Sequence, residues 1–245
     1  MFSFFKRTKT SPNSAFSLAA VQCDWHCHVL YGIDDGAQNE AQTLEMLQEY
    51  VSLGIKKIVA TPHVRADYFK NTSDTIKKAH EKVERLISQN NLPLVLESSA
   101  EYFADENFLG LIKKNELLPI ESQYILFELP MQQFPWGIKL VEEIQQKGYT
   151  PVLAHPERYR YWHTKPNEWK IWKNKGVCFQ LNLLSLTGYY GKAERRMAEQ
   201  LLDADYIDVV GTDAHGVRHL QKLADLNGNP YFDKLQQLPL LNHLG

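Results

Sequence analysis

Four short segments of the chain combine imidazole and carboxylate side chains in patterns that suit metal binding. They occupy residues 24–28, 61–63, 154–158 and 211–215. Each segment lies at the end of an apolar run that is typical of a β-strand. Side chains at positions i and i+2 of a strand point to the same face, so His26 and His28 can bind one cation together, and Asp213 and His215 have the same spacing. The segments predict a hydrolytic metal centre.

Strand-like segments alternate with helix-like segments along the chain, which is typical of βα units that build a parallel sheet. Seven strands are expected, at residues 24–29, 57–61, 94–100, 124–129, 150–154, 177–182 and 208–212. Helices are expected at residues 39–53, 75–89, 108–114, 138–147, 167–175 and 193–203. Three of these helices are followed by Gly54, Gly148 and Gly176, where a left-handed residue can end a helix.

One domain is the simplest interpretation of 245 residues with 44% hydrophobic content, although this length also suits two small domains. We expect residues 21–245 to form the domain and residues 1–20 to form a mobile N-terminal extension. A signal peptide is the alternative for this extension, but its apolar stretch is short and is interrupted by Ser17.

The composition excludes some classes of protein. A formal net charge of −2 gives no support to a protein that binds nucleic acid. Three cysteines without C-x-x-C spacing argue against disulfides and indicate a cytoplasmic protein. No apolar run approaches the roughly 20 residues that span a bilayer. Contact with a membrane is therefore expected only indirectly, through a partner.

Polar residues fall at the C-terminal end of nearly every predicted strand. Barrel enzymes build their active sites from these ends and from the loops that follow them. The residues concerned are His26, His28, His63, Glu101, Glu128, His155, Asp213 and His215. All of these side chains can therefore lie together at the C-terminal end of the sheet. The other histidines fall on predicted helices or loops and are expected at the surface.

The choice of carboxylates stays open at this point. Glu97 and Glu101 share a strand face, and Asp34 and Asp35 are neighbours, so spacing cannot select within either pair. Glu128 lies in an apolar run, where a charge is costly unless it binds a metal or a buried arginine.

Arg158 follows His155 closely and suits bidentate capture of a phosphate, although it can also be a solvated loop residue. Arg65 and Arg218 are weaker candidates for the same role. Ligands that mix imidazole with carboxylate favour manganese, iron or zinc. Carboxylates that bridge two or three ions would activate a water and clamp the oxygens of an in-line displacement.

Six motifs together resemble a known superfamily. They are Asp-x-His-x-His at 24–28, Gly-Ile-Asp-Asp-Gly at 32–36, Thr-Pro-His at 61–63, Ser-Ala-Glu at 99–101, His-Pro-Glu-Arg at 155–158 and Thr-Asp-x-His at 212–215. The chain is similar to the PHP (polymerase and histidinol phosphatase) superfamily over nearly its whole length. Within it, the chain resembles the CpsB type of bacterial protein-tyrosine phosphatases of capsular and exopolysaccharide biosynthesis.

The resemblance implies an α/β fold, a distorted seven-stranded (β/α) TIM-like barrel of the PHP type, with two to three Mn²⁺ ions in its site. It implies one ion held by His26, His28, Glu101 and Asp213, a second held by Glu128 and His155 with Glu101 shared, and a third held by Asp35, His63 and His215. Arg158 matches the arginine that contacts the substrate phosphate, and Arg218 aligns only approximately with a second family arginine.

These observations predict a cytoplasmic protein-tyrosine phosphatase in which a metal-bridged hydroxide attacks phosphorus, with Asp213 and Arg158 as catalytic residues. The expected substrate is the phosphotyrosine tail of a bacterial tyrosine kinase that controls polysaccharide export. One alternative is a phosphatase of small molecules such as histidinol phosphate. Another is a non-catalytic regulator that docks a kinase.

Aromatic residues are frequent in the loops expected around the site. They include Tyr68, Phe69, Tyr159, Tyr161 and Trp162. They are expected either to form a rim that stacks against the phenyl ring of phosphotyrosine or to pack the loops.

Overall fold

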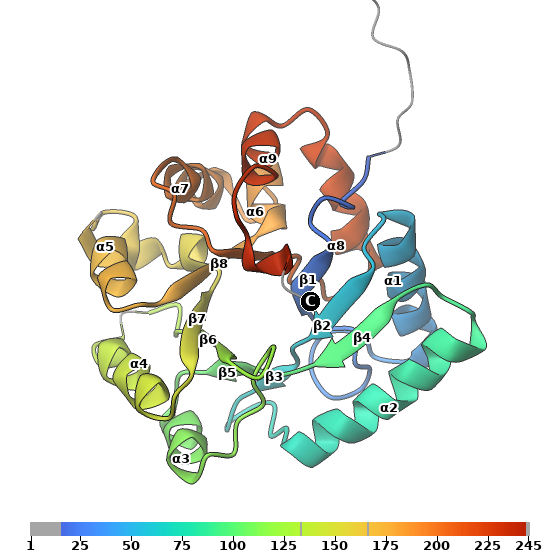
Figure 1. Ribbon diagram of the computed structural model, residues 1–245, viewed down its shortest axis with the longest axis horizontal. Helices are drawn as coiled ribbons and strands as arrows, with labels where there is room; N and C mark the ends of the chain where they lie inside the picture. Colours follow the sequence, from blue (N-terminus) through green and yellow to red (C-terminus); the bar gives the residue numbers. More distant parts are fainter. Residues whose placement is uncertain (1–15, 133, 166, 244–245) are drawn as a thin grey trace, which may run out of the picture.

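The computed structural model describes residues 16–132, 134–165 and 167–243, which form an α/β fold with parallel strands curled inside a layer of helices (Figure 1). The strands are β1 (Cys23–Cys27), β2 (Lys57–Ala60), β3 (His63–Val64), β4 (Val95–Ser98), β5 (Glu101–Phe103), β6 (Tyr124–Glu128), β7 (Thr150–Ala154), β8 (Cys178–Asn182) and β9 (Val209–Gly211).

The strands form two parallel sheets, of order β1-β2-β4 and β3-β5-β6-β7-β8-β9. Each of the expected strand segments is found, but the second is broken into β2 and β3 and the third into β4 and β5. The break follows from Pro62, which has no N–H to continue the ladder. Residues 99–100 lie opposite residues 61–62 in the register, so the neighbouring strand breaks at the same level.

The first strand meets the segment after the last one. The N–H of Asp213 donates to the carbonyl of His26 at 2.7 Å, and the N–H of His28 donates to that of Ala214 at 3.0 Å. Asn242 joins the same strands, because its side chain accepts from the N–H of Val210 and donates to the carbonyl of Cys23. We call this junction of β1 with β9 the seam.

A buried carboxylate reinforces the seam. Asp24 accepts hydrogen bonds from the Thr212 N–H at 2.9 Å, the Thr212 hydroxyl at 2.6 Å and the Tyr50 hydroxyl at 2.7 Å. Each carboxylate oxygen of this residue is therefore satisfied without water. The contacts fix the strand that carries His26 and His28 beside the residues that precede Asp213.

The helices are α1 (Glu40–Ser52), α2 (Ser73–Gln89), α3 (Glu106–Lys114), α4 (Gly137–Gln146), α5 (Asn167–Asn174), α6 (Leu183–Thr187), α7 (Lys192–Asp203), α8 (Val217–Lys222) and α9 (Pro230–Leu235). Short 3-10 helices are η1 (Pro156–Arg158), η2 (Arg160–Trp162), η3 (Leu223–Leu226) and η4 (Leu241–His243). The expected helices correspond to α1–α5 and α7. Gly54, Gly148 and Gly176 have φ of 82°, 85° and 77°, which confirms the predicted left-handed ends.

Two apolar clusters divide the core. The smaller cluster fills the interior of the curl and contains Trp25, whose ring meets Tyr124 edge-on at 5.2 Å. Cys27 belongs instead to the larger cluster, which includes residues of the helices. Trp25 and Cys27 are two residues apart and would share one face of a regular strand, but the register of β1 shifts between Asp24 and Cys27. Such an irregularity turns successive side chains to new faces.

The predicted mobile extension, residues 1–20, is described only from Phe16 onward, and residues 1–15 lie outside the described residues. Leu18 is fully buried, and its N–H donates to the carbonyl of Leu53 at 2.7 Å. Residues 16–20 therefore belong to the packed fold. No helix in the described ranges has the length and apolar character to span a membrane.

Candidate metal centre

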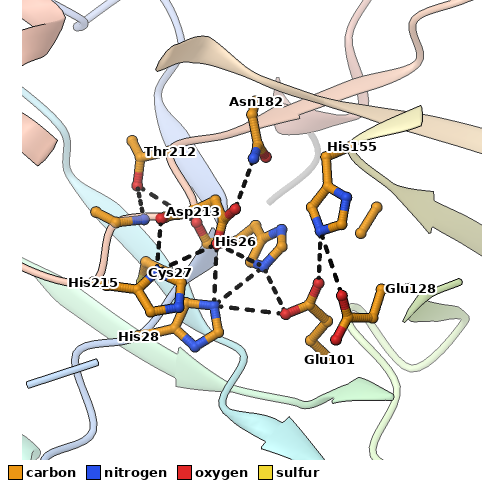
Figure 2. A network of polar contacts seen from close by, with 12 residues as sticks. His26, Cys27, His28, Glu101, Glu128, His155, Asn182, Thr212, Asp213 and His215 are labelled. Atoms are coloured by element: carbon orange, nitrogen blue, oxygen red, sulfur yellow. Dashed lines mark hydrogen bonds and ion pairs between the residues drawn. The ribbon is translucent and has the colours of Figure 1, made fainter. Parts of the chain in front are cut away.

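Glu101, at the start of β5, is joined by dashed lines to His26, His28 and His155 in Figure 2. Its Oε2 is 3.2 Å from His26 Nε2 and 2.9 Å from His63 Nδ1, and its Oε1 is 3.0 Å from His155 Nε2. The carboxylate is fully buried. One side chain thus faces histidines from three different strand ends, as a shared ligand would.

The two oxygens of Asp213 face different partners. Oδ1 lies 3.5 Å from His26 Nε2 and 3.3 Å from His28 Nε2. Oδ2 accepts from Arg158 Nη1 at 2.9 Å and from Asn182 Nδ2 at 2.7 Å. The carboxylate therefore joins His26 of β1 and His28, which follows β1, to the guanidinium of Arg158.

Asp35 and Glu128 complete the cluster on its outer side. Asp35 Oδ1 is 3.4 Å from the Nε2 atoms of both His63 and His215. Glu128 Oε1 is 3.5 Å from His63 Nδ1, and its Oε2 is 3.9 Å from His155 Nε2. The structure thus brings together all nine residues that were predicted as ligands.

Ligand atoms of three overlapping groups lie within 4.8 Å of one another among the described residues. These groups are His28, Asp35, His63 and His215; His26, His28 and Glu101; and His63, Glu101 and Glu128. Sharing of Glu101, His28 and His63 between groups is the arrangement expected for adjacent cations with bridging ligands.

The donor atoms fit divalent cations. Glu101 Oε2 and His63 Nδ1 are buried without a hydrogen-bond partner, although each points into the cluster. Unpaired buried polar atoms are costly unless an ion or water satisfies them. Nitrogen and oxygen donors in mixed groups suit manganese, iron or zinc.

The electrostatics of the cluster also favour cations. Burial alone would lower the pKa of His26, but the charges of Glu101 and Asp213 outweigh it and raise the pKa to about 10. The pKa of His63 rises to about 10 in the same way, mainly through Glu101. Burial and the charge of Glu101 raise the pKa of Glu128 to about 8. In the absence of bound cations, protons on these side chains therefore neutralise the negative charge of the carboxylates.

Backbone geometry turns two of these residues inward at the strand ends. His155, after β7, has φ of 38°, and Asp213, after β9, has φ of 51°. Residues other than glycine rarely adopt this left-handed conformation. Such strain is concentrated at functional sites, where the surrounding structure enforces it.

Two residues outside the predicted ligand set orient the histidines, and one of them is Asp34, from the pair that the sequence left open. Asp34 Oδ2 bonds His28 Nδ1 at 2.8 Å, and Gln180 Oε1 bonds His26 Nδ1 at 2.8 Å. Partners of this kind fix the ring that a metal binds. The structure therefore distinguishes the two neighbouring aspartates: Asp35 reaches the cluster, whereas Asp34 lies behind His28. Gln180 carried no signal, because its strand had no candidate residue.

The glutamate pair is separated as well. Glu97 lies on β4 and forms an ion pair with Lys57 at 3.0 Å, whereas Glu101 lies beyond the break, on β5. The break lets the two side chains face different environments despite their even spacing.

The cluster forms one wall of a cavity of about 590 Å³. Arg158 and Arg65 both line this cavity. Arg218 is exposed and lines a separate hollow beside His215. The structure therefore does not bring Arg218 into the cavity of the metal cluster.

The predicted aromatic rim is only partly present. Phe69 lines the cavity and stacks on His63 at 5.5 Å. Phe103 also lines it and was not predicted. Tyr159 and Trp162 are buried in the core, so they have the packing role that was the alternative to the rim. The Tyr159 hydroxyl accepts from the Leu129 N–H at 2.8 Å and supports the cavity wall from behind.

A curled parallel sheet with clustered metal-type ligands and an arginine at its strand ends defines the class of α/β metal-dependent hydrolases. The family model for capsular polysaccharide synthesis proteins, CpsB/CapC, matches residues 22–224. The chain therefore belongs to the CpsB/CapC family.

Two relatives illustrate the similarity. Tyrosine-protein phosphatase YwqE of Bacillus subtilis is 34% identical over 197 residues, which cover 80% of this chain and 78% of the relative. Tyrosine-protein phosphatase CpsB of Streptococcus pneumoniae is 26% identical over 222 residues, which cover 85% of this chain and 90% of the relative.

Solved structures agree with this assignment. A crystal structure from a study of YwqE and CpsB, described there as metal-dependent tyrosine phosphatases, matches with a TM-score of 0.76 and 29% identity. It covers 89% of this chain and 96% of its own. Histidinol phosphate phosphatase of Lactococcus lactis matches with a TM-score of 0.57 at 13% identity, over 90% of this chain and 95% of its own, and so shares the fold.

Proposed function

We propose that this protein is a metal-dependent protein-tyrosine phosphatase. The observation that carries the proposal is the position of Arg158. Its guanidinium is tied to Asp213 and lines the same cavity as the metal-type ligands. The names of the relatives support tyrosine phosphate as the substrate.

The ligands of two to three Mn²⁺ ions would be those implied by the family resemblance, with iron or zinc as the other metals that suit the donors. They are His26, His28, Asp35, His63, Glu101, Glu128, His155, Asp213 and His215. When bound, the cations would supply an activated water and would neutralise charge on the phosphoryl oxygens.

The side chains of the cavity divide the remaining work. Arg158 binds phosphate oxygens through the guanidinium donors that Asp213 leaves free. Phe69 and Phe103 line the wall and can contact the phenyl ring of the substrate. Tyrosine phenolate has a pKa of about 10 and leaves with less help from a general acid than an alkoxide needs.

Cysteine chemistry is not part of the proposal. The structure describes Cys23, Cys27 and Cys178, and none of the three lines the cavity. Burial raises the pKa of Cys27 well above its usual range and disfavours a thiolate there.

We further infer that the fold is a distorted seven-stranded TIM-like barrel. In this interpretation β2 with β3, and β4 with β5, are two bent strands, and the hydrogen bonds of the seam support closure. The same proposal places the protein in the cytoplasm, with the phosphotyrosine tail of a bacterial tyrosine kinase as its partner. Contact with the membrane would then be indirect.

The test is hydrolysis of a phosphotyrosine peptide by chelator-treated protein, with and without added Mn²⁺. We expect loss of turnover on metal removal and recovery on addition. Matched phosphoserine peptide and histidinol phosphate should be poorer substrates, because a shorter phosphoester cannot contact both the aromatic wall and the cluster. Undiminished turnover by metal-free protein would contradict the metal site. Preference for histidinol phosphate would favour a small-molecule phosphatase, and kinase binding without turnover would favour a docking regulator.

A further inference from the structure

A second, smaller hollow adjoins the cavity of the metal cluster. Its volume is about 260 Å³, and it is lined by Met131, Arg158, Arg160, Tyr190 and Glu194. Met131 and Arg158 also line the larger cavity, so the two hollows share a wall. The smaller one, which we call the side pocket, has room for a single side chain.

The side pocket presents an accessible guanidinium. Arg160, in η2, donates through Nε to Glu194 Oε1, and 72% of its side chain is exposed. Among the described residues, Glu194 is the only carboxylate within 4.0 Å of the Arg160 guanidinium. The terminal Nη groups of Arg160 therefore remain free to donate to a ligand.

Glu194 balances the charge of Arg160 but leaves its terminal donors accessible. Only 5% of its side chain is exposed, and its Oε2 is buried. A ligand in the side pocket would meet the donors of Arg160 rather than the acceptors of Glu194. Arg158 on the shared wall adds positive charge, although Asp213 balances part of it.

We propose that the side pocket binds an acidic side chain one or two positions from the phosphotyrosine of a peptide substrate. The inference rests on the proposed function. An extended chain advances about 3.3 to 3.6 Å per residue, so a neighbouring residue can enter the adjoining hollow. Its carboxylate pairs with Arg160, and its methylene groups pack against Met131 and the ring of Tyr190. Arg160 is then a specificity-determining residue.

The competing explanation is structural. The Arg160–Glu194 pair joins η2 to α7. In the competing explanation, the pair only holds these two elements together. In that case loss of Arg160 alters stability and affects every peptide equally. Selectivity between peptides separates the two explanations.

The experiment compares three phosphotyrosine peptides that differ at one neighbouring position, which is Glu, Gln or Lys. Metal-loaded wild type, Arg160→Gln, Arg160→Glu and Arg195→Gln are assayed for kcat and KM. Arg195→Gln is the matched control, because Arg195 also pairs with a glutamate of α7, Glu199 at 2.9 Å, and lines neither hollow. Melting temperatures report folding.

Wild type and the Arg195→Gln control should favour the Glu peptide over the Gln peptide by about threefold in KM, as expected for an exposed ion pair. Arg160→Gln should lose this preference at unchanged kcat, and Arg160→Glu should prefer the Lys peptide. Equal KM values for the three peptides in wild type, or an Arg160→Gln variant that keeps the preference, would overturn the side pocket. Absence of turnover of all peptides by wild type would instead contradict the proposed function and the inference with it.

Discussion

At the scale of single residues, Asp213 has the most demanding position in the site. One oxygen faces the paired histidines at the end of β1, and the other accepts from Arg158 and Asn182. It can therefore bind a metal and at the same time hold Arg158, the arginine proposed to bind phosphate. Its positive φ shows that the backbone is strained to achieve this position.

Asp213→Ala and Arg158→Ala should therefore differ in kind. Asp213→Ala removes a proposed ligand, so we expect metal content to fall and kcat/KM to drop by at least about 100-fold. Arg158→Ala should keep its metals and lose about 100-fold in kcat/KM, the typical effect of removing one donor to the transition state. Metal analysis beside phosphopeptide kinetics checks both. Full activity of Arg158→Ala would exclude it from the site.

Tyr190 should also influence phosphate capture, because the Arg158 guanidinium lies over its ring at 4.6 Å. Tyr190→Phe keeps the ring and should retain activity, whereas Tyr190→Leu should lower kcat/KM by about threefold to tenfold through the lost cation–π contact. Tyr231→Leu is the control, since Tyr231 lies on α9 and its hydroxyl donates to Asp203. In an Arg158→Ala background, Tyr190→Leu should add no further loss. An additive loss there would show that Tyr190 acts independently of Arg158.

At the scale of elements, the seam decides whether the ligands meet. Tyr50 of α1 donates to Asp24, which also accepts from Thr212 of the segment after β9. The oxygen of Tyr50 also lies 2.8 Å from the Thr212 hydroxyl. Three elements that are distant in sequence are thus joined at one carboxylate.

Tyr50→Phe should lower the free energy of unfolding by about 1 to 3 kcal/mol, because it leaves buried polar groups short of a partner. Urea unfolding in the presence of a chelator measures the change without the contribution of metal binding. Tyr68→Phe serves as the control, since 71% of Tyr68 is exposed. If the two variants are equally stable, the buried hydroxyl does not stabilise the seam.

The elements also show which features were predictable from sequence. Periodicity and glycine caps located the strands and the six main helices, because those signals are local. The break at Pro62 decides which glutamate faces the cluster, and it depends on pairing between distant strands. The conformation of one loop decides that Asp35, and not Asp34, faces the cluster. Gln180 contacts His26, which is far away in sequence. No local pattern encodes such contacts.

At the scale of the whole molecule, apolar and polar ends are separated. The interior cluster around Trp25 and Leu126 is apolar, while the residues at and after the strand ends collect carboxylates and imidazoles. A packed interior excludes water from one side of the ligands. Metal loading is therefore coupled to the protonation of the entire cluster.

Metal binding at pH 7 should release about one to four protons per chain, because Glu128, with a pKa raised to about 8, would also lose a proton when it binds. The pKa values of His26 and His63 are raised to about 10 and that of His215 to about 9, so all three rings are protonated at pH 7 without metal. A ring must lose a proton before its nitrogen binds a cation, so the apparent affinity should rise with pH until about pH 9 to 10. Calorimetry in two buffers that differ in ionisation heat measures this release. Identical heats in both buffers would contradict the raised pKa values.

The seam also has a consequence for biosynthesis. His26 and His28 are translated nearly two hundred residues before Asp213 and His215, which face them. The hydrogen bond from Asn242 to the carbonyl of Cys23 likewise joins residues far apart in the sequence. A nascent chain on the ribosome therefore cannot complete the cluster until the segment after β9 has emerged, although the ligand groups within residues 26–128 are synthesised well before it.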